Sequence, residues 1–199
     1  MLERSSALVG VMKDGGRDGA DGKRRLRVGE ARGWALVQIA AYPGTAVELR
    51  SAMEQLLGVH LPDVVGRATV NGARRVLKIG LREYWIIAHD DPTIPAALQS
   101  AVAPTIGCST SLSHSRTCLW IDGSSSRDVL ATDIALDLHP DVFPINFFAL
   151  TGLRHTPLMI YRSGQNRFEL YILRTFALWA WDWLLDAALP YGYEIIEQK

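Results

Sequence analysis

The amino-acid sequence predicts an α+β fold made of two similar small lobes, each an antiparallel or mixed sheet with helices on one face. Short apolar runs with strand character alternate with segments whose apolar residues recur at helical spacing. The order strand, glycine turn, helix, two strands, helix occurs twice, at an offset of roughly 80 residues. We therefore expect a flexible N-terminal tail over residues 1–27, an N-terminal lobe over 28–106 and a C-terminal lobe over 107–199.

The prediction of a tail depends on composition. Residues 13–25 are rich in glycine and charged side chains and contain almost no large apolar group. Such a segment buries too little surface to offset the conformational entropy that it would lose on ordering. The alternative is an arm that becomes ordered against a partner chain.

The first lobe opens with an apolar strand over residues 34–41. Thr45 is a candidate cap for a helix over residues 46–57, and Gly58 stands where a C-cap belongs. Asn71–Gly72 is a strong hairpin signal because both residues tolerate the turn geometry that hairpins need. The other elements expected in this lobe are strands at 68–70, 75–79 and 84–88 and a helix over 94–102 that starts at Asp91–Pro92.

The second lobe opens with a strand-like run over residues 113–121, closed by the turn signal Asp122–Gly123. Three serines, Ser124–Ser126, offer N-cap oxygens to a short helix over residues 126–132. Prolines at 140 and 144 then end regular structure. The remaining elements expected are strands at 147–152, 158–162, 168–173 and 193–196 and a last helix over 175–188.

The last helix carries two tryptophans and two aspartates on one side. Trp179, Asp182, Trp183 and Asp186 recur at three- and four-residue spacing. Aromatic side chains on a polar face are typical of a contact surface, so we expect both tryptophans to pack against a partner chain. Burial between the two lobes is the main alternative, and a folate or flavin stacking site is a lesser one. The expected core stripe on the other side is Phe176, Ala177, Leu178, Trp181, Leu184 and Leu185.

A second candidate contact surface combines charged residues with a proline-containing loop. Arg116 and the loop over residues 136–144 are expected to form a polar seam, because arginine pairs readily with carboxylates and a rigid loop presents side chains at low entropy cost. A solvated charge network is the simpler alternative. The interface residues predicted here are His114, Arg116, His139 and Phe143.

The Ser113–His114–Ser115 sequence does not predict nucleophilic catalysis. Neighbouring side chains in a strand point to opposite faces, whereas a catalytic Ser–His pair must converge. A metal site is also not predicted, because Cys108, His114 and Cys118 would spread along an extended strand far beyond the reach of one ion. The two cysteines do not indicate a disulfide framework.

Composition narrows the classes of partner. Lysine plus arginine and aspartate plus glutamate both number 21, so no net charge favours nucleic acid or an anionic membrane. No uncharged apolar run approaches the roughly 20 residues of a membrane-spanning helix, which makes the cytoplasm the expected location. Glycine-rich phosphate loops are missing from strand–helix contexts, so no FAD, NAD or other nucleotide is expected on this chain.

Two motifs carry a resemblance to a known family. Residues 112–117, followed after a gap by 136–140 and by Phe143–Pro144, resemble the gamma subunit of heterotetrameric sarcosine oxidase. The resemblance runs from about Arg27 to Tyr193, and in outline it extends to the folate-binding aminomethyltransferase superfamily.

The resemblance implies a non-flavin subunit of an oxidoreductase complex that demethylates sarcosine to glycine, passes the one-carbon unit to tetrahydrofolate and reduces oxygen to peroxide. It places FAD, FMN, NAD and tetrahydrofolate on partner subunits, makes the alpha subunit the main contact beside the beta and delta subunits, and gives this chain no catalytic residue. A free-standing folate-binding aminomethyltransferase-like protein, or the equivalent subunit of a related amine or imino-acid oxidase, stays open as an alternative.

Overall fold

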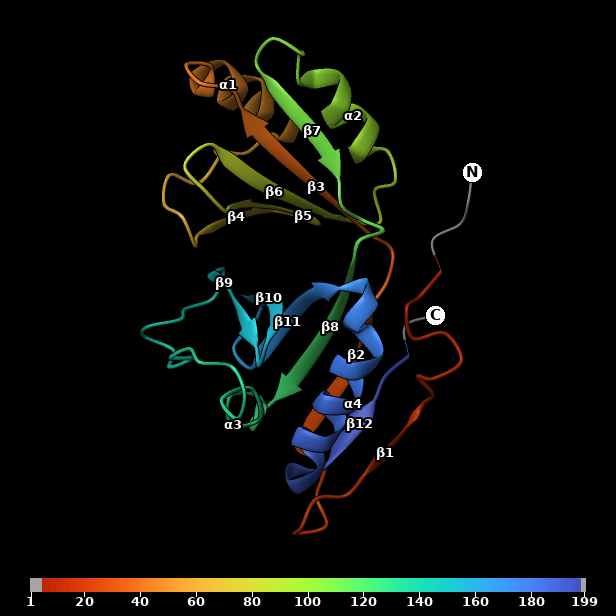
Figure 1. Ribbon diagram of the computed structural model, residues 1–199. Coiled ribbons are helices and arrows are strands. Elements are labelled where there is room, and N and C mark those ends of the chain that lie inside the picture. Colours follow the sequence, from red (N-terminus) through yellow and green to blue (C-terminus); the bar gives the residue numbers. More distant parts are fainter. Residues whose placement is uncertain (1–4, 198–199) are drawn as a thin grey trace. The chain divides into compact units, whose positions relative to one another are not determined.

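The computed structural model describes residues 5–197, and these form two compact units (Figure 1). The inserted unit is Gly33–Ser113, and the split unit combines the residues before it with those from His114 onward. This division differs from the predicted lobes 28–106 and 107–199. Residues 28–32 belong to the split unit and residues 107–113 to the inserted unit. The reason is that β2 (Leu26–Ala31) pairs with β8 (Arg116–Gly123) and β7 (Gly107–Ser111) pairs with β3 (Trp34–Ala41), partners distant in sequence that local patterns do not reveal.

The inserted unit contains a five-stranded sheet of order β4-β5-β6-β3-β7, in which every pair is antiparallel. The hairpin predicted at Asn71–Gly72 is confirmed, with Asn71 paired to Arg74 at its end. The strands of this sheet are β3 (Trp34–Ala41), β4 (Ala68–Asn71), β5 (Arg74–Lys78), β6 (Glu83–His89) and β7 (Gly107–Ser111).

Helices α1 (Ala46–Leu57) and α2 (Ile94–Ala101) bury their apolar residues against one face of this sheet. The predicted bounds of α1 are confirmed, and Gly58 closes the helix in the left-handed conformation, with φ 65°. Thr45 does not cap α1 through its side chain, because its hydroxyl donates instead to the carbonyl of Ile106. The core side chains contributed by the two helices are Leu49, Met53, Leu57, Ile94 and Leu98.

The split unit contains a seven-stranded mixed sheet of order β1-β12-β2-β8-β11-β10-β9. Only the β12–β2 pair is parallel among the described strands. The strands are β1 (Gly15–Arg17), β2 (Leu26–Ala31), β8 (Arg116–Gly123), β9 (Phe148–Leu153), β10 (Thr156–Arg162), β11 (Arg167–Leu173) and β12 (Tyr193–Ile195).

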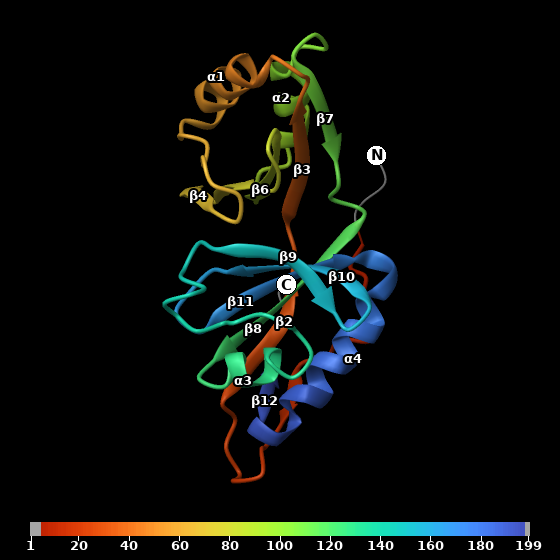
Figure 2. The same ribbon diagram turned by 60° about the vertical axis from the view of Figure 1, so that its left-hand side comes forward.

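Helices α3 (Ser126–Leu130) and α4 (Ala177–Ala188) cover one face of the seven-stranded sheet (Figure 2). A 3₁₀ turn, η1 (Arg174–Phe176), leads into α4, and a second one, η2 (Leu189–Tyr191), follows it. Trp181 and Leu184 are fully buried against strand residues such as Leu170. Burial of such an apolar helix face supplies most of the stability of a helix of this length.

The first described segment is part of the split unit and not a flexible tail. Leu8 and Met12 are buried in its core, and β1 pairs with β12. The glycines make this close packing possible, because a Cβ on Gly16 would lie 2.4 Å from the carbonyl oxygen of Tyr193. The glycine-rich composition indicated disorder. In the structure, the absence of a side chain on Gly16 lets β1 lie close to the backbone of β12.

The strand predicted over residues 113–121 is interrupted in the structure. β7 ends at Ser111 and β8 begins at Arg116, and the two strands belong to different sheets. Cys108 and Cys118 therefore lie in different units, and both are free thiols. No helix among residues 5–197 is long and apolar enough to cross a membrane.

Candidate functional site

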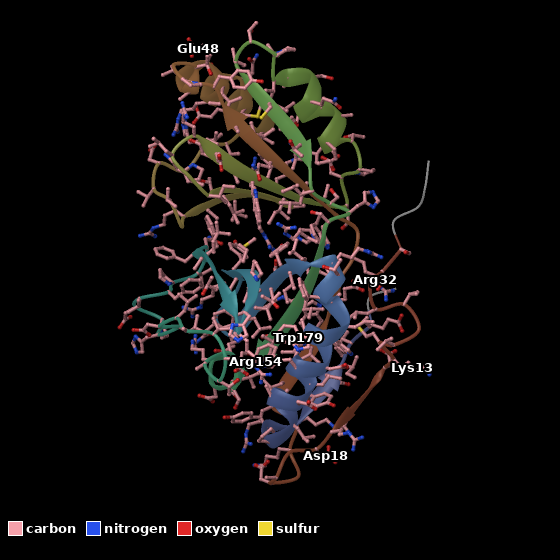
Figure 3. The ribbon with its side chains drawn as sticks, in the orientation of Figure 1. Lys13, Asp18, Arg32, Glu48, Arg154 and Trp179 are labelled. Atoms are coloured by element: carbon pink, nitrogen blue, oxygen red, sulfur yellow. The ribbon has the colours of Figure 1, made fainter. Side chains whose placement is uncertain are left out.

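A groove of about 430 Å³ opens beside α4 in the split unit. It contains all four α4 residues that the sequence singled out, together with two residues that follow α3 and one residue of the β9–β10 turn. Figure 3 labels Trp179 and Arg154, which contribute to its lining from α4 and from the turn. The lining residues are Thr132, Asp133, Arg154, Trp179, Asp182, Trp183, Asp186, Ala187, Pro190 and Tyr191.

A fixed polar triad forms the inner part of the groove. The indole Nε1 of Trp183 donates to Asp133 Oδ2 at 2.7 Å, and Arg154 donates to both carboxylate oxygens of Asp133 at 3.0 Å. The hydrogen bonds from Arg154, and then that from Trp183, lower the pKa of Asp133. The same carboxylate raises the pKa of Arg154. Asp133 is therefore held as an anion with its charge already paired.

The backbone positions Arg154 for this role. Leu153, the last residue of β9, pairs with Thr156, the first residue of β10, and this leaves a two-residue turn in which Arg154 adopts φ 51°. Its backbone N–H also donates to the carbonyl of Asp133 at 3.4 Å. The turn is thus joined to the segment after α3 through both main chain and side chain.

The two tryptophans of α4 have different environments, which corrects the prediction that both face outward. Trp183 is only 6% exposed and belongs to the core, whereas Trp179 is 36% exposed. Phe176 and Leu178, expected in the core, are also exposed. Phe176 lies in η1, before α4 begins, and the buried residues of α4 are Ala177, Ala180, Trp181, Trp183, Leu184 and Ala188.

The two aspartates of α4 differ from Asp133. Asp182 and Asp186 are exposed, and the side-chain carboxylate of neither makes a hydrogen bond or ion pair with any residue between 5 and 197. They lie one helical turn apart on the side of α4 that lines the groove. The groove therefore combines one exposed indole face with two carboxylates whose charge is not neutralised.

The other predicted interface residues do not line this groove. His114 is exposed in the turn between β7 and β8. Arg116 begins β8, and its Nη1 donates to the side chain of Ser115 at 3.2 Å. His139 is exposed, and its backbone N–H donates to Asp137 Oδ1 at 2.8 Å, which fixes the start of the proline-containing loop.

Phe143 is a core residue, contrary to the prediction that it contributes to an interface. It is only 5% exposed and packs edge to face against Phe147, with ring centroids 6.2 Å apart. The buried guanidinium of Arg162 donates to the carbonyl of Phe143 at 2.7 Å. The Phe–Pro pair of the sequence motif therefore anchors the loop from inside the split unit.

The groove residues suit binding better than acid–base chemistry. The carboxylate of Asp133 is engaged by two donors, and its lowered pKa opposes proton uptake near neutrality. Within residues 5–197, no three His, Cys, Asp or Glu side chains are grouped so that they could hold a metal ion. Asp133 and Arg154 carry no local sequence signal, because only the fold brings them to Trp183.

Comparison with known proteins places this chain among oxidase subunits. A model described as "Sarcosine oxidase, gamma subunit family" matches residues 38–189. The sarcosine oxidase subunit gamma of an Arthrobacter species is 30% identical, with coverage of 96% of this chain and 92% of the relative. The corresponding subunit of Corynebacterium sp. (strain U-96) is 29% identical over 83% of this chain and 80% of its own length.

Solved structures agree with the sequence relatives. A chain of the heterotetrameric sarcosine oxidase from Corynebacterium sp. U-96 superposes with a TM-score of 0.79 at 27% identity, covering 87% of this chain and 88% of that chain. The glycine cleavage system aminomethyltransferase T from Bartonella henselae shares the fold, with a TM-score of 0.64 at 16% identity over 87% of this chain and 48% of that chain. The family match covers most of the sequence, and this chain belongs to the sarcosine oxidase gamma subunit family.

Proposed function

We propose that this chain is the non-flavin gamma subunit of a heterotetrameric sarcosine oxidase-type complex, in which it stabilises the assembly beside the alpha subunit. The observation that carries the proposal is that the similarity extends over nearly all of this chain and nearly all of its relatives. The chain matches nearly the whole length of an Arthrobacter gamma subunit, and its fold matches nearly a whole chain of a heterotetrameric sarcosine oxidase. The aminomethyltransferase match, by contrast, covers only 48% of that enzyme.

In this proposal the complex converts sarcosine to glycine, transfers the one-carbon unit to tetrahydrofolate and produces peroxide from oxygen in the cytoplasm. FAD, FMN, NAD and tetrahydrofolate are assigned to the partner subunits, with the alpha subunit as the main contact and the beta and delta subunits completing the particle. The chemistry of the groove is compatible with a binding role, because its one paired carboxylate is a poor general acid or base near neutrality.

A second candidate function is a free-standing folate-binding protein of the aminomethyltransferase type. The observation that favours this candidate is the fold shared with the aminomethyltransferase from Bartonella henselae, although that similarity covers only 48% of the larger enzyme. The equivalent subunit of a related amine or imino-acid oxidase is a closer variant of the leading proposal. It differs in the amine that the complex oxidises.

Co-expression distinguishes these functions. The full chain carrying an affinity tag is expressed with the alpha, beta and delta subunits of the same organism, and captured material is assayed for flavin absorbance and sarcosine-dependent peroxide. We expect all four subunits and both signals. Saturable binding of tetrahydrofolate by the chain alone, without capture of the other subunits, would contradict the proposal. Activity with another N-methyl or imino acid instead of sarcosine would favour the related oxidase.

A further inference from the structure

We infer that the α4 groove receives an arginine side chain from a partner subunit, with the guanidinium between the indole of Trp179 and the carboxylates of Asp182 and Asp186. This inference rests on the proposed function, because it requires that the chain works within an assembly. Beyond the proposed function, it names the kind of side chain that a partner subunit places in the groove, which membership of the family does not specify.

Charge selects a cation for the groove. Three carboxylates and one guanidinium line it, and Arg154 is committed to Asp133 through two hydrogen bonds of 3.0 Å. The charges of Asp182 and Asp186 are left without a partner among residues 5–197. Because acidic and basic residues balance over the whole sequence, this groove is a local excess of negative charge. A complementary positive group on a partner would be attracted to it.

Geometry favours arginine over lysine. Asp182 and Asp186 are one turn apart on α4, so their Cβ atoms are about 5–6 Å from each other, within the span of a planar guanidinium fork. Trp179 precedes Asp182 by three residues and exposes part of its indole to the groove. A guanidinium can stack on an indole face while it donates to carboxylates, which a compact ammonium group does less well.

Exposed apolar residues near the groove residues in the sequence favour a protein over a free amine. Phe176 in η1, Leu178 in α4 and Leu189 in η2 are apolar side chains of 40 to 50% exposure. They precede and follow the groove residues of α4 along the chain. A small cation would leave these apolar side chains in water, whereas a protein surface could cover them while it delivered a charged anchor. The groove residues Trp183 and Asp133 are already held in place by their mutual hydrogen bond, so they need not rearrange when a partner binds.

The test uses the full complex captured through a tag on this chain, with the dissociation rate of the partner subunits measured at increasing KCl. Asp182→Asn combined with Asp186→Asn should speed dissociation about tenfold at low salt, because removing one side of a hydrogen-bonded charge pair that is buried at an interface acts mainly on the off-rate. The difference should shrink as salt screens the remaining attraction. Trp179→Leu should speed dissociation at every salt concentration. Glu48→Gln, an exposed acidic residue of the inserted unit, is the matched control and should leave the rate unchanged.

The outcomes separate this inference from the proposed function. If the wild-type chain captures no partner subunits, both fail. If the wild type and the groove variants dissociate at the same rate with the same salt dependence, the groove inference is wrong while the proposed function stands. Self-association of the chain alone that the double asparagine variant abolishes would assign the groove to a second copy, and would also overturn the inference. Thermal unfolding of each purified variant confirms that the substitutions leave the fold intact.

Discussion

The indole N–H of Trp183 and the carboxylate of Asp133 meet at 2.7 Å, although the two residues are 50 positions apart in the sequence. This hydrogen bond joins the inner face of α4 to the segment after α3, and Arg154 completes the arrangement from the β9–β10 turn. Three separate segments of the chain therefore build one wall of the groove. All three side-chain hydrogen bonds that join these segments end on the carboxylate of Asp133.

Substitution Trp183→Phe should lower the free energy of unfolding by about 1.5–3 kcal/mol beyond the loss of packing, because one hydrogen bond to a charged carboxylate is removed. Trp120→Phe is the control, since Trp120 is equally buried but its Nε1 has no hydrogen-bond partner among the described residues. Urea denaturation of the two variants measures the difference. Equal destabilisation would show that the bond to Asp133 contributes nothing.

Stability should depend on pH through Asp133. Its pKa is lowered in the folded protein by Arg154 and Trp183, so its contribution is fully present above the unfolded-state value of about 3.9 and is lost as pH falls through the lower folded value. The gap in unfolding free energy between wild type and Asp133→Asn should be widest near neutrality and should narrow below about pH 4. A gap that stays constant from pH 7 to pH 3 would contradict this account.

The N-terminal segment should contribute to the core of the split unit. Leu8 is fully buried while its neighbour Val9 is 70% exposed. Leu8→Ala should cost about 2–5 kcal/mol of stability through the cavity that it leaves. Val9→Ala should change stability by less than about 0.5 kcal/mol. Chemical denaturation of the full chain checks the pair, and a small cost for both would mean that the segment behaves as the tail that composition suggested.

Arg162 should hold the loop that carries the family motif. Its guanidinium is buried and donates to the carbonyls of Phe143 and Gln165 at 2.7 and 2.8 Å. Arg162→Lys keeps the charge but removes the planar guanidinium that donates to both carbonyls, so it should destabilise the protein by about 2 kcal/mol. Arg24→Lys alters an exposed ion pair and should have almost no effect. Proteolysis of the loop should accelerate in the Arg162 variant alone, and loop cleavage at the wild-type rate would refute the anchoring role.

Local signals explain which elements the sequence revealed. The bounds of α1 follow from apolar spacing and Gly58, and the β4–β5 hairpin follows from Asn71–Gly72, because each depends on residues that are adjacent in the chain. The two-sheet α+β architecture was predicted for the same reason. The split of the chain at residues 33 and 113 was not found, since it depends on the pairing of β2 with β8 and of β7 with β3.

The candidate site was found only in part. Helical spacing correctly grouped Trp179, Asp182 and Asp186 on the groove side of α4, but it could not reveal that Trp183 turns its indole into the core. Asp133 and Arg154 carried no sequence signal, because their roles arise from a tertiary contact. A left-handed non-glycine residue in a tight hairpin, such as Arg154, becomes visible only in the structure.

Native mass spectrometry of the co-expressed assembly tests the central claim most directly. The account predicts one particle that contains this chain together with one alpha, one beta and one delta subunit, and the particle should retain flavin. A preparation in which alpha, beta and delta assemble into a stable, sarcosine-oxidising particle while this chain stays separate as a monomer would contradict it.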